Sequence, residues 1–194
     1  VRDIISRYEV DAIHMDDYFY PYPVPGVDFP DDASWEKYGK GQGWTDRGDW
    51  RRHNVDLLIE QLHKTLQEVK PWVQFGISPF GIWRNKDVDP RGSETKGLQC
   101  YDALYADCPK WTKEGWVDYM VPQLYWEQEH PRANGKVLMH WWNGEAYGRG
   151  MYYGFSVHNM MGNKDTRDTT INNQLGEKME LLRTLEHVNG VVWW

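Results

Sequence analysis

The sequence has no long hydrophobic run and no concentration of basic charge. Its apolar stretches are only a few residues long, far short of the ~20 residues that a membrane-spanning helix needs. Lys and Arg number 22 against 29 Asp and Glu, which gives a net charge of −7. Because nucleic acid binding depends on clustered Lys and Arg, the composition argues against a nucleic acid partner as well as against a membrane-spanning segment.

Cysteine is also scarce, since Cys100 and Cys108 are the only two. Two cysteines form neither a disulfide framework nor a zinc-binding pattern. If both lie in one helix, a rise of 1.5 Å per residue places them roughly 12 Å apart, too far for a disulfide. The sequence also lacks a glycine-rich phosphate loop after its first expected strand, which weakens a dinucleotide-binding fold. No cofactor is expected.

Aromatic residues, in contrast, are abundant. The chain contains 12 Trp, 12 Tyr and 5 Phe, which make 15% of its 194 residues. A core seldom needs so many large rings with polar groups, and the flat C–H faces of sugars stack on such rings. Core packing explains many of them equally well. The composition indicates a globular domain in which some aromatic side chains suit a carbohydrate cleft.

Short apolar runs alternate with helical stretches along the chain, which is typical of a parallel sheet. Helical periodicity is clearest between Asp49, which occupies an N-cap position, and Pro71. Helices are expected over about residues 50–70, 98–113 and 170–187, with a short one around 138–141. Strands are expected over residues 10–15, 73–78, 118–125, 151–157 and 188–194.

Long polar loops follow the expected strands, whereas the links from helix to strand are short. Active sites of (β/α)8 barrels lie on the face where such loops gather. We therefore expect an α/β fold in which residues 1–194 are a single domain, the C-terminal five or so β/α units of a TIM (β/α)8 barrel whose N-terminal strands are absent. An open doubly wound sheet is the alternative. Unpaired strand edges predict that this segment associates with copies of itself.

Two adjacent carboxylates follow the first expected strand. Side chains alternate across a strand, so His14, Asp16 and Tyr18 are expected to face the barrel axis, while Asp17 points to the other side. A solvated turn explains an arbitrary acidic pair. The position at a strand end, the polar His14 within the strand and the following aromatic residues favour a functional role.

A second carboxylate, Glu127, follows the third expected strand. Glycoside hydrolysis requires two carboxyl groups, one ionised and one carrying a proton for the leaving oxygen. Asp16 and Glu127 are the preferred catalytic pair, with Asp17 as a further candidate. In the segment WEQEH, Glu129 is an alternative to Glu127, and a plain surface loop explains both.

Further polar and aromatic residues near the strand ends are candidates for substrate binding. A Gln in a buried strand needs partners such as sugar hydroxyls. An Arg guanidinium can bind a substrate carboxylate, although structural ion pairs are commoner, and a lone His is more often structural. The candidates are His14, Tyr18, Trp83, Arg84, Asn85, Gln123, Tyr125, Trp126 and His158.

Five sequence blocks together resemble the glycosyl-hydrolase-like 10 family of bacterial proteins: DAIHMDDYFYPYP, DWRRHNVDLLI, KPWVQFGISPFGIWRN, GLQCYDALYADCPKW and DYMVPQLYWE. The resemblance is strongest over residues 1–142. It implies a (β/α)8-barrel glycosidase that acts on an extracellular or cell-wall polysaccharide, such as peptidoglycan glycan strands. It also implies an extracellular, periplasmic or lipid-anchored cell-surface location. The matched blocks support Asp16, Asp17, Gln123, Tyr125, Trp126 and Glu127 as site residues.

Two other functions use the same residues. A metal-dependent hydrolase would take His14, Asp16 and Asp17 as ligands, but the sequence has no His-x-His pair and supplies a zinc site poorly. A barrel that binds carbohydrate without turnover would keep its affinity after replacement of Asp16 by Asn, whereas a glycosidase would lose rate. We expect an oligosaccharide or polysaccharide partner and no bound metal.

Overall fold

The structure, a computed structural model, describes residues 1–157 and 174–194. Its strands are β1 (Ala12–Met15), β2 (Gln74–Ile77), β3 (Tyr119–Met120), β4 (Gly150–Phe155) and β5 (Gly190–Trp193). They lie in sequence order in one sheet, and every neighbouring pair is parallel. A doubly wound sheet reverses its strand order, whereas the wall of a barrel does not. The prediction of a partial (β/α)8 barrel is confirmed.

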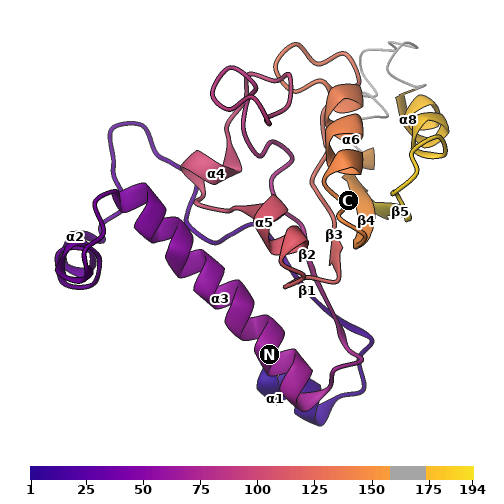
Figure 1. Cartoon of the computed structure of the whole chain (residues 1–194). Coiled ribbons are helices and arrows are strands. Elements are labelled where there is room, and N and C mark those ends of the chain that lie inside the picture. Colours follow the sequence, from indigo (N-terminus) through magenta and orange to yellow (C-terminus); the bar gives the residue numbers. More distant parts are fainter. Residues whose placement is uncertain (158–173) are drawn as a thin grey trace.

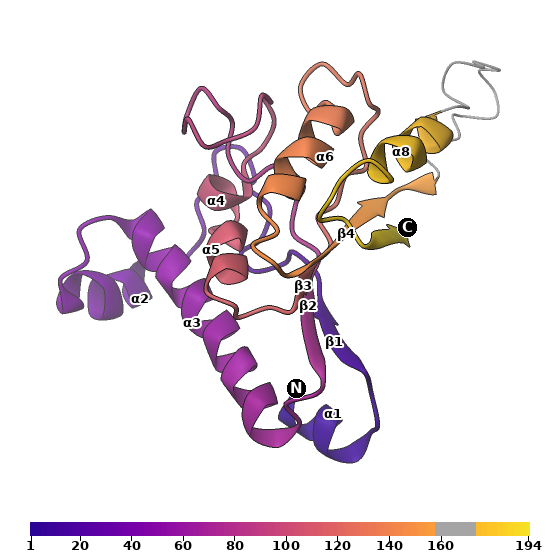
Figure 2. The ribbon, with the colours of Figure 1, turned by 45° about the vertical axis from the view of Figure 1, so that its right-hand side comes forward.

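Helices alternate with these strands and lie mainly on one side of them. Figures 1 and 2 show α3, α5 and α6 together on the same side of β1 to β4. In the described part of the chain, no helix is both long and apolar enough to cross a membrane. The α-helices are α1 (Arg2–Arg7), α2 (Asp32–Ser34), α3 (Arg47–Val69), α4 (Cys100–Ala103), α5 (Cys108–Lys113), α6 (Gly135–Gly144) and α8 (Gln174–Leu182).

The long helix α3 begins three residues earlier than the sequence predicts. Asp46, rather than Asp49, is its N-cap, because Asp46 Oδ1 accepts a hydrogen bond from the Asp49 main-chain N–H at 2.7 Å. The helix ends at Val69, before Pro71. Between β1 and α3 the loop contains α2 and two further turns, a π-helical turn (Trp35–Gly39) and a 3-10 turn (Lys40–Gln42).

The hydrophobic core lies between the sheet and its helices. Alternate residues of the strands enter this core, as expected from the two-residue period of a strand. From α3 the core receives the buried side chains of Val55, Ile59 and Leu66. The strand residues in or packed against the core include Ile13, Met15, Phe75, Ile77, Met120, Met151, Tyr153 and Phe155. The intervening strand residues therefore face the opposite side of the sheet.

The expected helix over residues 98–113 is two short helices, α4 and α5. The chain turns between them at Tyr105, whose φ of 54° lies in the left-handed region. The two cysteines consequently belong to different helices, and both thiols lie near the same acceptor, the Ala106 carbonyl, at 3.6 Å for Cys100 and 3.9 Å for Cys108. The predicted position of both cysteines along one helix is wrong.

The third strand is shorter than its apolar run predicts. Only Tyr119 and Met120 form β3, although Gln123 makes further bridges with Phe80 and Gly154. Pro122 has no N–H to donate to a neighbouring strand, so the regular ladder stops before it. β1 and β5 form the two edges of the sheet; self-association through these edges stays a prediction.

Candidate active site

A layer of alternating large and small side chains crosses the sheet on the face turned away from the helices. His14, Gly76, Tyr119 and Gly150 are aligned across β1 to β4. A Cβ atom on Gly76 would lie 2.0 Å from Cζ of Tyr119, so the tyrosine ring occupies the space above this glycine. The ring stacks on the imidazole of His14, with centroids 5.6 Å apart.

Both ring nitrogens of His14 have hydroxyl partners. Nδ1 lies 3.2 Å from the Tyr119 hydroxyl oxygen, and Nε2 lies 2.6 Å from Ser78 Oγ. Desolvation lowers the pKa of His14 and outweighs the opposing effect of the Asp16 carboxylate. A neutral imidazole follows, with one nitrogen donating and the other accepting.

Asp16 lies just beyond the C-terminal end of β1, in an exposed position. Its Oδ1 accepts hydrogen bonds from Gln123 Nε2 at 2.8 Å and from the Asp17 main-chain N–H at 2.8 Å. Gln123 Nε2 also donates to the Ser78 carbonyl at 3.0 Å. One glutamine thus links the ends of the first three strands and orients the Asp16 carboxylate.

Asp17 differs from its neighbour in its surroundings. Its side chain is only 3% exposed, and its Oδ2 accepts a hydrogen bond from the Tyr22 hydroxyl. Burial raises the pKa of Asp17, the charge of Asp16 adds to this rise, and the hydrogen bond from Tyr22 opposes it. Burial therefore gives Asp17 a greater tendency to hold a proton than a carboxyl group in water has, as the role of an acid requires.

These side chains line a cavity of about 430 Å³ at the C-terminal ends of the strands, the usual location of a barrel active site. Its size is within the range of small-ligand sites. The cavity brings together the predicted site residues His14, Asp16, Asp17, Tyr18, Gln123 and Tyr125. Tyr18 is 74% exposed, which leaves its ring free to stack on a sugar.

Some cavity residues were not singled out by sequence analysis, namely Tyr22, Ser78, Val192 and Trp194. Ser78 shares the two-residue alternation of β2 with Gly76, so that period extended past the strand end identifies it. Tyr22 lies in an irregular loop, and Trp194 follows β5. Trp194 lies two positions after Val192, so the two-residue period of β5 connects these two cavity residues. For Tyr22, no periodic signal distinguishes a cavity position from any other.

Glu127 lies on the loop between β3 and α6 and is exposed. It is not among the residues that line the cavity around Asp16. Its main-chain carbonyl accepts a hydrogen bond from Gly135 N at 3.0 Å, while the neighbouring Trp126 packs edge-on against Phe80. The pairing of Glu127 with Asp16 stays a prediction.

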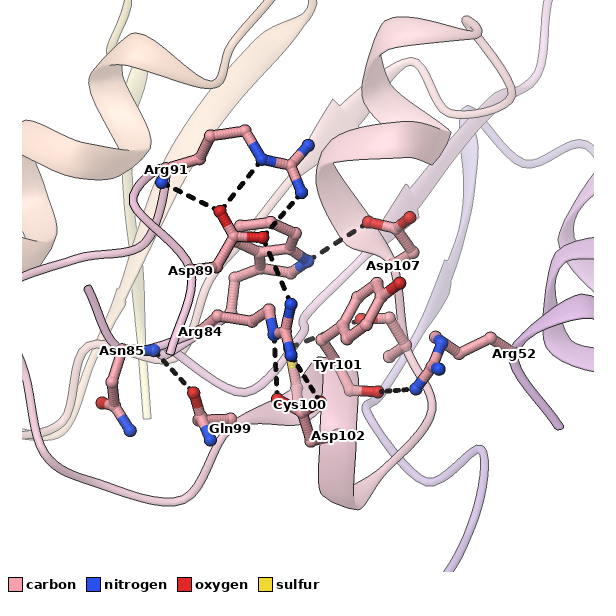
Figure 3. A network of polar contacts seen from close by, with 12 residues as sticks. Arg52, Arg84, Asn85, Asp89, Arg91, Gln99, Cys100, Tyr101, Asp102 and Asp107 are labelled. Atoms are coloured by element: carbon pink, nitrogen blue, oxygen red, sulfur yellow. Dashed lines mark hydrogen bonds and ion pairs between the residues drawn. The ribbon is translucent and has the colours of Figure 1, made fainter. Parts of the chain in front are cut away.

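Trp83, Arg84 and Asn85 lie outside this cavity. Figure 3 shows Arg84 and Asn85 in a polar network formed by residues between β2 and α5. Arg84 Nε donates to Asp102 at 3.0 Å, and the Trp83 indole N–H donates to Asp107 at 3.2 Å. Asn85 is buried and bonded to neighbouring loop residues. These contacts hold the loop, and substrate binding by the three residues stays a prediction. His158 lies outside the described residues.

Metal binding has little support from the arrangement of donors. Across residues 1–157 and 174–194, no three His, Cys, Asp or Glu side chains are grouped so that they could hold a metal ion. His14, Asp16 and Asp17 therefore do not form such a group. His14 presents its two nitrogens to Ser78 and Tyr119. The donor geometry therefore does not favour the metal-dependent alternative.

Fold and cavity together define a partial (β/α)8 barrel with a carboxylate-bearing pocket at the usual face. Residues 1–170 match the family described as Glycosyl hydrolase-like 10, and the chain belongs to that family. The resemblance seen in the sequence is thereby confirmed.

Two named relatives share a large part of this sequence. The chain is 43% identical over 187 residues to "Glycosyl hydrolase YngK" of Bacillus subtilis (strain 168), covering 90% of this chain and 36% of that protein. It is 42% identical over 142 residues to "Glycosyl hydrolase DigH" of Escherichia coli (strain K12), covering 73% and 32%. The chain thus spans about a third of the length of these curated relatives.

One solved structure, bee venom hyaluronidase in a monoclinic crystal form, is similar with a TM-score of 0.45 and 13% sequence identity. This match covers 85% of this chain and 51% of that one.

Proposed function

We propose that this chain supplies part of the active site of a glycoside hydrolase that cleaves O-glycosidic bonds in a polysaccharide. The observation that carries this proposal is the exposed Asp16 carboxylate, which Gln123 holds in a cavity lined by tyrosine and tryptophan residues. Sugar rings stack on such side chains. Family membership supports the same chemistry.

In the proposed mechanism, Asp16 is the ionised carboxylate that attacks the anomeric carbon or activates water. Glu127 is its proposed partner and protonates the leaving oxygen. Asp17, whose pKa is raised by burial, supports Asp16 and is the alternative proton donor. His14 and Gln123 have polar atoms at the same cavity and are proposed to bind sugar hydroxyls.

The test uses the full-length protein that contains this segment, incubated with peptidoglycan glycan strands and with other polysaccharides, and the products are identified by mass spectrometry. Replacement of Asp16 by Asn should reduce kcat by about 10²- to 10⁴-fold, the usual contribution of a catalytic acid or base. Asp11→Asn, a substitution before β1, is the matched control and should leave the rate unchanged. A fully active D16N variant contradicts the proposal.

The same assay identifies the second carboxylate. Glu127 and Glu129 are both exposed and lie two positions apart on one loop, so Glu127→Gln and Glu129→Gln form a matched pair. A large loss of kcat in E127Q alone supports the proposed pairing. A loss in E129Q alone assigns the role to Glu129.

A binding module without turnover is the second candidate, favoured by the exposed Tyr18 ring at the cavity. The D16N variant separates the two functions. In a binding module, D16N keeps its affinity for the polysaccharide, and the wild type releases no product. Calorimetry on D16N beside the product assay gives both readouts.

The proposed substrate is an extracellular or cell-wall glycan, such as peptidoglycan strands. The proposed location is extracellular, periplasmic or, with a lipid anchor, at the cell surface. The two relatives come from bacteria, which supports a cell-envelope glycan. Fractionation of cells that express the full-length protein tests the location. Recovery of the protein only from the cytoplasm contradicts it.

A further inference from the structure

Lys178, on α8, is a fully buried lysine whose partners are main-chain carbonyls. Its side chain is 0% exposed. Its Nζ donates hydrogen bonds to the carbonyl oxygens of Trp126 at 2.5 Å and Leu124 at 3.2 Å, and it lies 4.9 Å from the ring centroid of Phe155. Burying an ammonium group is costly unless its hydrogen bonds are well made. An apolar residue would pack at this position without that cost, so the presence of a lysine indicates a role for its hydrogen bonds.

The carbonyls that Lys178 binds belong to the loop that carries Glu127. Gln174, one turn earlier on α8, accepts a hydrogen bond from the main-chain N–H of Gln128 at 2.9 Å. Helix α8 therefore holds the main chain on both sides of Glu127, through Trp126 and through Gln128.

A third contact holds the same segment from the start of α6. Gly135 N donates to the Glu127 carbonyl at 3.0 Å. A Cβ atom on Gly135 would lie 3.0 Å from the Trp126 oxygen, 3.1 Å from the Glu127 oxygen and 3.3 Å from Cε of Lys178. The loop, the helix start and the lysine are thus in close contact, with little room for the loop to shift.

We propose that Lys178 is a positioning residue, which fixes the main chain around Glu127 so that the carboxylate of Glu127 is held in one place. This inference rests on the proposed function, because it takes Glu127 as a carboxylate of the active site. Displacement of a catalytic group by about 1 Å costs up to about 100-fold in rate, so an anchor on this loop has a large effect on catalysis.

The charge of Lys178 gives the proposal a measurable pH dependence. Burial lowers the pKa of Lys178 to about 8, and the charge of Glu127, the carboxylate that acts on it, partly opposes this shift. Below pH 8 the charged ammonium makes strong hydrogen bonds to both carbonyls. Above pH 8 the amine loses its charge and these bonds weaken, so kcat should fall on the alkaline side. The folded state then no longer contains a buried charge, whose desolvation is unfavourable.

The experiment is Lys178→Met in the full-length protein, with Lys136→Met, an exposed lysine on α6, as the matched control. K178M should lose about 10- to 100-fold in kcat with little change in KM, and its remaining rate should no longer fall near pH 8. Its melting temperature should stay equal or rise, because an apolar side chain of similar length replaces a buried charge. If Lys178 only stabilised the fold, K178M would instead have a lower melting temperature, and its remaining kcat would depend on alkaline pH as the wild type does.

Amide hydrogen exchange over residues 124–128 separates this inference from the proposed function. If the wild type cleaves no glycan, the proposed function fails, and faster exchange in K178M still supports the anchor. Unchanged exchange together with unchanged kcat overturns it. If K178M does not fold, Gln174→Ala is the second variant. Q174A should speed amide exchange at Gln128 and lower kcat, while its kcat should still fall near pH 8 because Lys178 is retained. Exchange and kcat equal to the wild type in Q174A would contradict the proposed positioning of the loop by α8.

Discussion

Gln123 and Asp16 are 107 positions apart in the sequence, yet Gln123 Nε2 lies 2.8 Å from Asp16 Oδ1. Since β2 lies between β1 and β3, the glutamine side chain reaches across the end of the middle strand, where it also donates to the Ser78 carbonyl. The orientation of the Asp16 carboxylate is thus coupled to the position of the third strand.

Replacement of Gln123 by Leu should lower kcat/KM about 10- to 100-fold, because a hydrogen bond to a charged group contributes about 1.5–3 kcal/mol. Steady-state kinetics of the full-length protein check this expectation. Gln74→Leu is the matched control, since Gln74 is exposed at the start of β2, away from the cavity. Equal rates for Q123L and the wild type would show that Asp16 needs no such support.

Gly76→Ala should destabilise the fold by about 1–3 kcal/mol, the usual cost of overpacking. The new Cβ would meet the Tyr119 ring at 2.0 Å and displace it from His14. Gly144→Ala is the control, because a Cβ there has no atom within 4 Å, and alanine favours a helix by about 0.5–1 kcal/mol over glycine. Urea unfolding measures both. A G76A variant as stable as G144A contradicts the close packing.

Arg51→Met should destabilise the fold by about 1.5–3 kcal/mol, because the buried Asp31 carboxylate loses the hydrogen bonds from Arg51 and keeps only those from Arg47. Arg2→Met is the control: its ion pair with Glu68 is exposed on both sides, so its loss should cost below about 1 kcal/mol. Chemical denaturation at neutral pH compares the two. Similar losses in both variants would show that burial of the Arg51 pair is unimportant.

The same ion pair predicts acid sensitivity. Burial raises the pKa of Asp31, but the hydrogen bonds from Arg51 and Arg47 outweigh it, and the net pKa is lowered. The unfolded chain therefore takes up this proton first, so the contribution of Asp31 is complete above the ordinary carboxyl pKa and is lost as the pH falls through the lowered value. Unfolding curves from pH 7 downwards should show this loss in the wild type and a smaller one in R51M. Parallel curves would count against it.

Asp17→Asn should stabilise the fold at neutral pH and have little effect in acid. Burial raises the pKa of Asp17, so the folded state holds this proton at pH values where the unfolded state has lost it. Stability consequently falls as the pH rises through the window between the ordinary and the raised pKa, and asparagine removes that fall. Melting temperatures at pH 4 and pH 7, with Asp11→Asn as control, check the sign. Stabilisation that is larger at pH 4 reverses it.

The alternation of side chains along a strand predicted most of the cavity residues that lie at strand ends. Placing His14 and Asp16 on the face away from the helices needs only the two-residue period of β1. The prediction that Asp17 points to the other side is wrong, because Asp17 lies beyond the end of β1, where the strand period no longer applies, and it lines the same cavity as Asp16. The same period located Gln123 at the cavity, because a parallel sheet brings equivalent strand ends together.

Residues whose partners are remote in sequence were harder to interpret. Arg84 follows a strand, like a substrate-binding residue, but its guanidinium pairs with Asp102 on α4. The break between α4 and α5 depends on the left-handed backbone of Tyr105, a conformation that a tyrosine rarely adopts. Local periodicity specifies the face of a strand or helix, whereas these features depend on which distant groups meet after folding.

The ring of Tyr119 makes the side-chain volumes at three positions of the barrel wall depend on one another. A Cβ at Gly76 would meet the ring atoms at 2.0 Å, and one at Gly150 would lie 2.9 Å from the Tyr119 Cβ. Substitutions that share one volume are not additive in their energies. A homologue with a larger residue at position 76 should therefore carry a smaller one at position 119, and the imidazole of His14 would then need a new neighbour.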